Sequence, residues 1–197
     1  MTSATLEKEE LATESSKIMT LYNISWLQFK TIDLQLENNK SVKLSYLDGI
    51  MEIMSPVSRK HEYMKSTLGL LLETYMREKG IRFYRTGGFT LESPGYSSGI
   101  PDESYCINSN KEIPDIVIEI IVTSGTIKRT ELYKPLRVPE VWFWRNNQIN
   151  IFQFQTEDYQ EVTTSKFFPA LDKELLLKYL QYEDQYDAVN DFIQEQK

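Results

Sequence analysis

The chain has 197 residues, of which 41% are apolar and 26% are charged, and its formal net charge is −7. This size and composition are typical of one globular domain with a substantial core. No apolar run approaches the roughly 20 residues of a membrane-spanning helix, and the first sixteen residues lack the apolar run of a signal peptide. A single cysteine, Cys106, excludes an intramolecular disulfide and a zinc site built on cysteines. We therefore expect a soluble, cytoplasmic protein that does not associate with membranes.

The negative charge is concentrated at the two ends of the chain. Residues 1–16 and 172–197 contribute −3 and −4, whereas residues 17–171 carry eighteen charges of each sign. Proteins bind a phosphate backbone through lysine and arginine, so a uniformly acidic chain would argue against nucleic acid as a partner. A neutral body with a locally basic cleft is compatible with DNA binding, although the charge alone does not indicate it.

The predicted elements begin after an acidic tail. Residues 1–16 are rich in Glu, Ser and Thr without an apolar period, which predicts a disordered tail before a single domain over 17–197. A short helix is predicted from Ser25, a favourable N-cap, to Leu36. Two alternating runs then flank Asp48-Gly49, a dipeptide typical of tight turns, and predict a β-hairpin.

A long helix and three strands are predicted in the middle of the chain. The helical spacing is carried by Met64, Leu68, Leu71, Leu72 and Tyr75. Gly80 predicts the end of this helix. Strands are then predicted within residues 81–91, 101–107 and 115–123, separated by turn residues. The third is almost entirely β-branched and apolar, as is typical of a central strand that is covered on both faces.

The last third of the chain predicts a short helix, a strand pair and a helical end. The helix is expected from about Thr126 to Leu136, and the strands turn at Asn146-Asn147. Residues 173–197 predict an acidic helical segment, and self-association through it or through strand edges makes a homodimer one expectation. The order of elements implies an α/β fold in which helices flank a mixed central sheet, with an N-terminal β-hairpin.

Glu119 is the one charged residue in the interior of the predicted central strand. A buried carboxylate is strongly unfavourable unless it is paired, protonated or bound to a metal. Asp102 lies one strand earlier, so both carboxylates project from the same sheet edge if the two strands are neighbours. Two oxygen ligands on strands suit Mg²⁺ or Mn²⁺, with water and a substrate phosphate completing the coordination. The sequence therefore predicts a metal site at Asp102 and Glu119.

Three further residues are candidates for the same site. Lys128 and Arg129 begin the next predicted helix, where a cation can stabilise the charge on a phosphate under attack. His61, the only histidine, lies on the same face of the long helix as Met64, which directs it towards the sheet.

At these residues the sequence resembles the PD-(D/E)XK nuclease superfamily. Within it, the chain is similar to a large family of restriction-endonuclease-like proteins of unassigned function that is expanded in some photosynthetic bacteria. The resemblance covers roughly residues 25–155 and rests on LDGIMEIMSP followed by His61, on GIPDESY, on PDIVIEI and on TSGTIKRTELYKPLRVPEVWFW. It implies a restriction-endonuclease-like fold and magnesium-dependent hydrolysis of DNA. It also implies that Asp102 and Glu119 are the metal ligands and that His61 lies near them or near the phosphate.

The chain departs from the superfamily at its lysine. The usual position, two residues after the strand glutamate, is Ile121 here. The family resembled carries its lysine four residues before a tyrosine, and counting back from Tyr133 leads to Arg129. Because arginine keeps its charge at any ordinary pH, it is a poor substitute for a tunable amine. Either Lys128 takes the role, or Arg129 performs it imperfectly, or catalysis is lost. The alternative to an endonuclease is therefore an inactive nuclease-fold protein that binds nucleic acid or protein.

Several neighbouring residues also have structural interpretations. Asp115, which also follows a proline, lies further from the predicted site and is expected to be structural. Glu52 lies in an alternating strand, where a solvent-facing position and a site role both fit. Without a metal, Glu119 is expected to pair with an arginine of the following helix or strand. Residues 142–144 are three aromatics that are expected to divide between two core faces rather than stack on bases.

Overall fold

The computed structural model describes residues 17–38, 42–55, 58–122 and 125–196. The predicted tail over residues 1–16 lies outside these ranges. Within them, no helix is both long and apolar enough to cross a membrane.

The N-terminal part of the chain forms an antiparallel sheet with strand order β1-β3-β2-β6-β5. Its strands are β1 (Ile18–Leu21), β2 (Lys43–Leu47), β3 (Ile50–Met54), β5 (Leu91–Ser93) and β6 (Ser97–Gly99). The β2–β3 hairpin is the predicted one, and Gly49 at its turn has a φ of +87°, which glycine adopts without strain. Helix α2 (Trp26–Leu36) packs on this sheet through Phe29, and Ser25 caps it as predicted.

The central sheet has the order β11-β10-β9-β8-β7-β4. Its strands are β4 (Phe83–Arg85), β7 (Glu103–Ile107), β8 (Ile116–Ile120), β9 (Glu140–Arg145), β10 (Gln148–Gln155) and β11 (Asp158–Val162). The β8–β9 pair is parallel and the other pairs are antiparallel, so the predicted mixed sheet is confirmed. All five residues of β8 are buried, as expected of a central strand.

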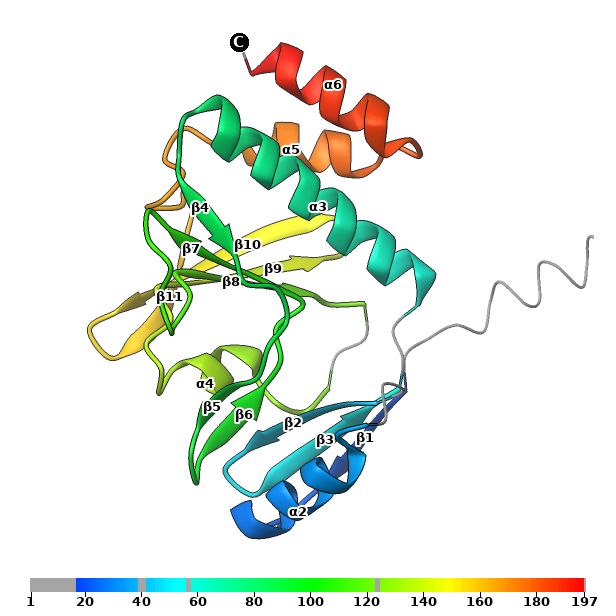
Figure 1. The fold of residues 1–197 in the computed structure, drawn as a ribbon, viewed down its shortest axis with the longest axis vertical. Coiled ribbons are helices and arrows are strands. Elements are labelled where there is room, and N and C mark those ends of the chain that lie inside the picture. The colour runs from blue at the N-terminus through cyan, green and yellow to red at the C-terminus, as the bar shows by residue number, and fades with distance from the viewer. Residues whose placement is uncertain (1–16, 39–41, 56–57, 123–124, 197) are drawn as a thin grey trace, which may run out of the picture.

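Helices cover both faces of the central sheet (Figure 1). One face packs against α3 (Arg59–Glu78) and α5 (Lys173–Leu180), and α6 (Gln185–Glu195) packs on these two helices. The short helix α4 (Arg129–Tyr133) lies on the other face, towards the N-terminal sheet. Alternation along β8 divides its side chains between the two cores, with Ile118 towards α3 and Val117 towards α4.

Two details of the prediction are wrong. Residues 81–91 are not one strand, because the chain leaves the central sheet after β4 and joins the N-terminal sheet at β5. The crossing passes Gly88, where a Cβ atom would lie 2.7 Å from the carbonyl oxygen of Pro101. Within the predicted C-terminal helical segment the structure forms two helices, and Asp184 caps the second. The third predicted helix is only the five residues of α4.

Candidate active site

Asp102 and Glu119 lie side by side where the neighbouring interior strands β7 and β8 begin and end. The β7–β8 register pairs Glu103 with Ile118, so one further residue places Asp102 opposite Glu119. The Asp102 amide donates to the carbonyl oxygen of Ile118 at 3.1 Å, which continues the ladder to this point. The prediction that the two strands are neighbours in the sheet is therefore confirmed. Glu119 is buried within β8, and the side chain of Asp102, the residue directly before β7, is 8% exposed.

The Asp102 carboxylate is surrounded by donors. Lys43 Nζ lies 2.9 Å from Oδ1, while His61 Nε2 and the Ile120 amide lie 3.1 and 2.8 Å from Oδ2. Burial by itself raises the pKa of Asp102, but the hydrogen bond with His61 and the charge of Lys43 outweigh it and hold the pKa well below its ordinary value. Asp102 is consequently ionised throughout the physiological range.

Glu119 has fewer compensating partners. Its Oε1 accepts a hydrogen bond from the Tyr133 hydroxyl, which α4 brings to this face of the sheet. Burial raises the pKa of Glu119, the Lys43 charge offsets this in part, and the neighbouring charge of Asp102 adds to the rise. A cation bound between the two carboxylates would remove this electrostatic penalty.

Lys43 is a site residue that the sequence did not reveal. It begins β2 in the N-terminal sheet, and its side chain is 22% exposed where it meets Asp102. In the sequence it looks like an ordinary polar position in an alternating strand. Its partner is 59 residues away, so no local pattern could have identified it.

Arg129 lies in the wall of the site and is held by the N-terminal hairpin. Its guanidinium donates to Ser45 Oγ at 2.6 Å and to Glu52 Oε2 at 3.3 Å. Glu52 is fully buried and also accepts from the backbone amides of Thr126 and Ile127. A solvent-facing Glu52 is therefore wrong, because its carboxylate ties the hairpin to the segment before α4.

The arginine partner expected for Glu119 in the absence of a metal is also not observed. Among the described residues, Arg129 bridges to Glu52, and the hydrogen-bond donor to Glu119 is Tyr133.

The structure brings together four of the five predicted site residues. Asp102, Glu119, His61 and Arg129 line one cavity of about 50 Å³, and Lys43 lines it with them. Lys128 does not line this cavity, because its side chain is 69% exposed and Nζ lies 3.2 Å from Glu131.

Asp115 directly precedes β8, at the end of the strand that lies away from Glu119. It accepts from the Ile107 amide at 2.7 Å and from Lys111, in agreement with the structural role expected of it.

The donor set suits a hard divalent cation. Within the described ranges, no group of three or more His, Cys, Asp and Glu side chains is arranged to hold a metal ion. Magnesium, however, is commonly bound through one or two carboxylates, with water and substrate phosphate as its remaining ligands. Asp102 and Glu119 supply two carboxylates, and a cavity of about 50 Å³ exceeds the roughly 30 Å³ that one water occupies. The residues present therefore fit magnesium better than a closed four-ligand zinc site.

Comparison with known proteins identifies the family. A search of curated proteins gives no match. The family model Uma2, described as "Putative restriction endonuclease", matches residues 29–184. Of the residues that line the cavity, all but Ile18 lie within this range. This match confirms the predicted resemblance and the restriction-endonuclease-like fold class. The chain belongs to the Uma2 family.

Proposed function

We propose that the protein is a magnesium-dependent endonuclease that hydrolyses phosphodiester bonds of DNA. The observation that carries the proposal is the pairing of Asp102 and Glu119 in register at the ends of two neighbouring strands, with three basic side chains around the same cavity. The family match supports nuclease chemistry, and the two carboxylates support magnesium, or manganese in its place.

The two carboxylates have different tasks in this proposal. Asp102 is ionised because its pKa is held low, so it binds a cation without first losing a proton. Glu119 is oriented by the Tyr133 hydroxyl, and a cation bound here would offset the electrostatic cost of its burial. A magnesium ion bound by this pair would supply positive charge to stabilise the phosphate under attack.

Lys43 is assigned the role that the superfamily gives to its lysine. Its ammonium group reaches the cavity from β2, carries three rotatable donors and is partly exposed to the space a phosphate would enter. Arg129 contributes a fixed charge, since Ser45 and Glu52 hold its guanidinium. His61 orients Asp102 through Nε2. Lys128 pairs with Glu131, so we assign it no catalytic role.

Plasmid cleavage tests the proposal. Purified protein is incubated with supercoiled plasmid and MgCl₂, MnCl₂ or EDTA, and nicked and linear products are quantified. Cleavage is expected with either metal, with none in EDTA, and Glu119→Gln and Asp102→Asn should abolish it. Glu174→Gln, which neutralises an exposed carboxylate on α5, is the matched control and should cleave like the wild type. Equal cleavage by wild type and Glu119→Gln would refute the proposal.

The second candidate is an inactive nuclease fold that binds nucleic acid or protein. It is favoured by arginine at the position where the family resembled carries lysine, and by the attachment of that arginine to Glu52. DNA binding without metal-dependent cleavage would support it. A homodimer stays a prediction, which sedimentation velocity tests.

A further inference from the structure

A groove on the α4 side of the central sheet adjoins the candidate active site. Its volume is about 340 Å³, and it lies between the residues that lead into α4 and the strands β9, β10 and β11. Ile121 and Arg129 line both this groove and the cavity of Asp102 and Glu119, so the two spaces share a wall. A nucleic acid strand with one phosphate at the two carboxylates therefore has the groove directly beside it.

The register of the central sheet places Arg145 close to the two carboxylates. Strands β8 and β9 are parallel, and Glu119 is paired with Phe143. Arg145 follows Phe143 by two residues, so both side chains project from the same face of β9, and both line the groove. Because neighbouring strands are about 4.8 Å apart and rise about 3.3 Å per residue, the Cα atoms of Glu119 and Arg145 are about 8 Å apart. Successive phosphates of one DNA strand advance about 3.4 Å along the helix axis, so Arg145 can reach a phosphate about two or three nucleotides from the one at Glu119.

Lys128 lines the groove from the side of α4. It is the predicted site residue that does not line the cavity, and its side chain is largely exposed. Its ion-pair partner Glu131 also lies 3.7 Å from Lys134, so that carboxylate is shared between two lysines. Ion pairs of exposed side chains contribute little stability, so the ammonium group of Lys128 can turn to a ligand at small cost.

The side chains that line the groove carry an excess of positive charge. Three are basic, Lys128, Arg129 and Arg145, and the single acidic one, Glu161, lies on β11, two strands away from Arg145. Glu52, which pairs with Arg129, does not line the groove. Among the described residues, no acidic side chain lies within ion-pair distance of Arg145. In a chain with a net charge of −7, this local excess favours an anionic ligand, and beside a phosphodiester site that ligand is the nucleic acid backbone.

We propose that the groove binds the sugar-phosphate backbone of the DNA strand whose cleaved phosphate lies at Asp102 and Glu119, and that Arg145 and Lys128 contact its neighbouring phosphates. The proposal rests on the proposed function, because it takes the ligand of the active site to be a nucleic acid. Backbone contacts position a strand and carry no sequence information, so the two side chains should act equally on any sequence. Lys128 thereby has a part in binding and none in catalysis.

Binding in EDTA tests the proposal independently of cleavage. Fluorescence polarisation measures the affinity of the full chain for two labelled DNA duplexes of unrelated sequence over a range of KCl concentrations. Each phosphate contact contributes about 0.9 to the slope of log affinity against log salt, which corresponds to about eightfold in affinity at about 0.1 M salt. Arg145→Gln and Lys128→Gln should each weaken binding by about this factor on both duplexes and lower the slope by about 0.9. Arg145→Lys and Lys128→Arg, which keep the charge, should retain most of the affinity.

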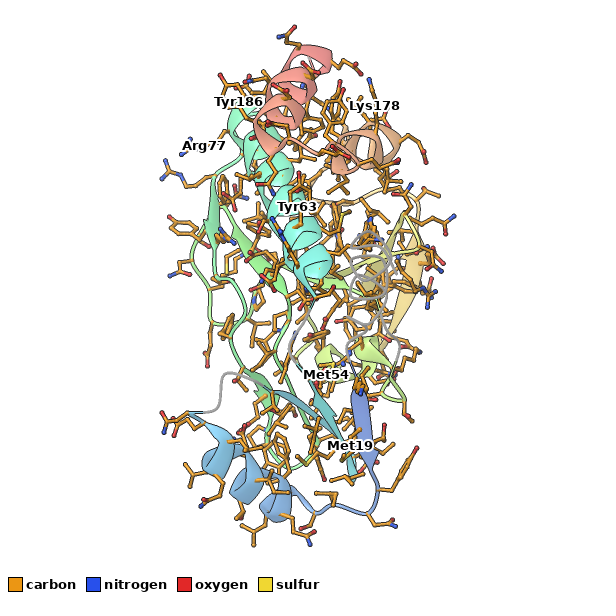
Figure 2. All side chains as sticks on the ribbon, turned by 90° about the vertical axis from the view of Figure 1, so that its right-hand side faces the viewer. Met19, Met54, Tyr63, Arg77, Lys178 and Tyr186 are labelled. Atoms are coloured by element: carbon orange, nitrogen blue, oxygen red, sulfur yellow. The ribbon has the colours of Figure 1, made fainter. Side chains whose placement is uncertain are left out.

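Arg77→Gln is the matched control, because it removes the same charge from another exposed arginine. Arg77 lies in the last turn of α3 and does not line the groove, and Figure 2 shows it well apart from Met54, which lines the cavity. Its substitution should leave the affinity and the slope unchanged. The proposal is overturned if the wild type does not bind DNA, if Arg145→Gln or Lys128→Gln equals Arg77→Gln in affinity and slope, or if the losses are confined to one duplex.

The two proposals fail separately. Loss of affinity and slope in Arg145→Gln and Lys128→Gln, without metal-dependent plasmid cleavage by the wild type, supports the groove as a backbone site and refutes the nuclease. Cleavage that depends on Glu119, combined with wild-type affinity in these two variants, supports the nuclease and refutes the groove.

Discussion

Substitution of Glu52 tests whether the N-terminal hairpin holds the cationic wall of the site. Glu52 is fully buried, and its carboxylate accepts from two backbone amides and from Arg129, whose side chain is 12% exposed. Removing one partner of a buried ion pair costs about 3–5 kcal/mol, and each buried amide left unpaired adds to the loss. Arg129 keeps its hydrogen bond to Ser45, which limits the penalty. We expect Glu52→Ala to lower the free energy of unfolding by about 4 kcal/mol.

Urea denaturation followed by circular dichroism measures this change. With an m value of about 2 kcal/mol per M, the midpoint of Glu52→Ala should fall by about 2 M. Glu52→Gln retains an oxygen for the two amides and should lose only about 2 kcal/mol. In a double-mutant cycle with Arg129→Met, the combined loss should be smaller than the two single losses together, because the two side chains interact. A Glu52→Ala protein within about 1 kcal/mol of the wild type would show that this contact does not hold the wall.

The remaining predictions concern the same cavity. A Cβ atom on Gly125 would lie 2.7 Å from the carboxyl carbon of Glu52, so Gly125→Ala should lose about 2 kcal/mol in urea denaturation, and an unchanged midpoint would contradict this. Lys43→Met should slow plasmid cleavage by about 10²–10³-fold and Lys43→Arg by less, and a wild-type rate for Lys43→Met would exclude the assigned role. In metal-free protein, the raised pKa of Glu119 means that its stabilising contribution is lost as the pH rises from its ordinary value of 4.5 through the raised one. The stability of Glu119→Gln relative to the wild type should therefore increase between about pH 4.5 and 8. The lowered pKa of Asp102 has the opposite consequence: its contribution is present above its ordinary value of 3.8 and is lost only as the pH falls further. Asp102→Asn should thus be less stable than the wild type throughout about pH 5–8. Urea midpoints that show no relative gain of Glu119→Gln with rising pH, or no deficit of Asp102→Asn, would refute the electrostatic account.

Features set by neighbouring residues were predictable from the sequence. Ser25 and the hairpin at Asp48-Gly49 are local signals, and both elements form where the pattern places them. The apolar composition of β8 indicates a buried central strand, so a charged residue within it, Glu119, stands out in the sequence. The pairing with Asp102 follows because consecutive strands are often neighbours in a sheet.

Features that depend on the packing of distant segments were not predictable. Lys43 meets Asp102 only because β2 begins beside the central sheet, and Glu52 meets Arg129 only because the same hairpin covers the start of α4. The double glycine after β4 lies inside what the sequence predicts as one strand, whereas it carries the chain from one sheet to the other. The placement of Lys128 and Arg129 also needed the structure, since adjacent residues at a helix start can face solvent or the site.

Manganese in a crystal tests the central claim most directly. Crystals of the wild type and of Glu119→Gln are soaked in MnCl₂, and anomalous difference density is calculated near the manganese absorption edge. The wild type should show a peak between Asp102 and Glu119, with oxygen distances near the roughly 2.0–2.2 Å typical of small hard cations, and Glu119→Gln should show none. A wild-type crystal with no peak between these two carboxylates, or with the same peak in Glu119→Gln, would contradict the assignment of the pair as a metal centre.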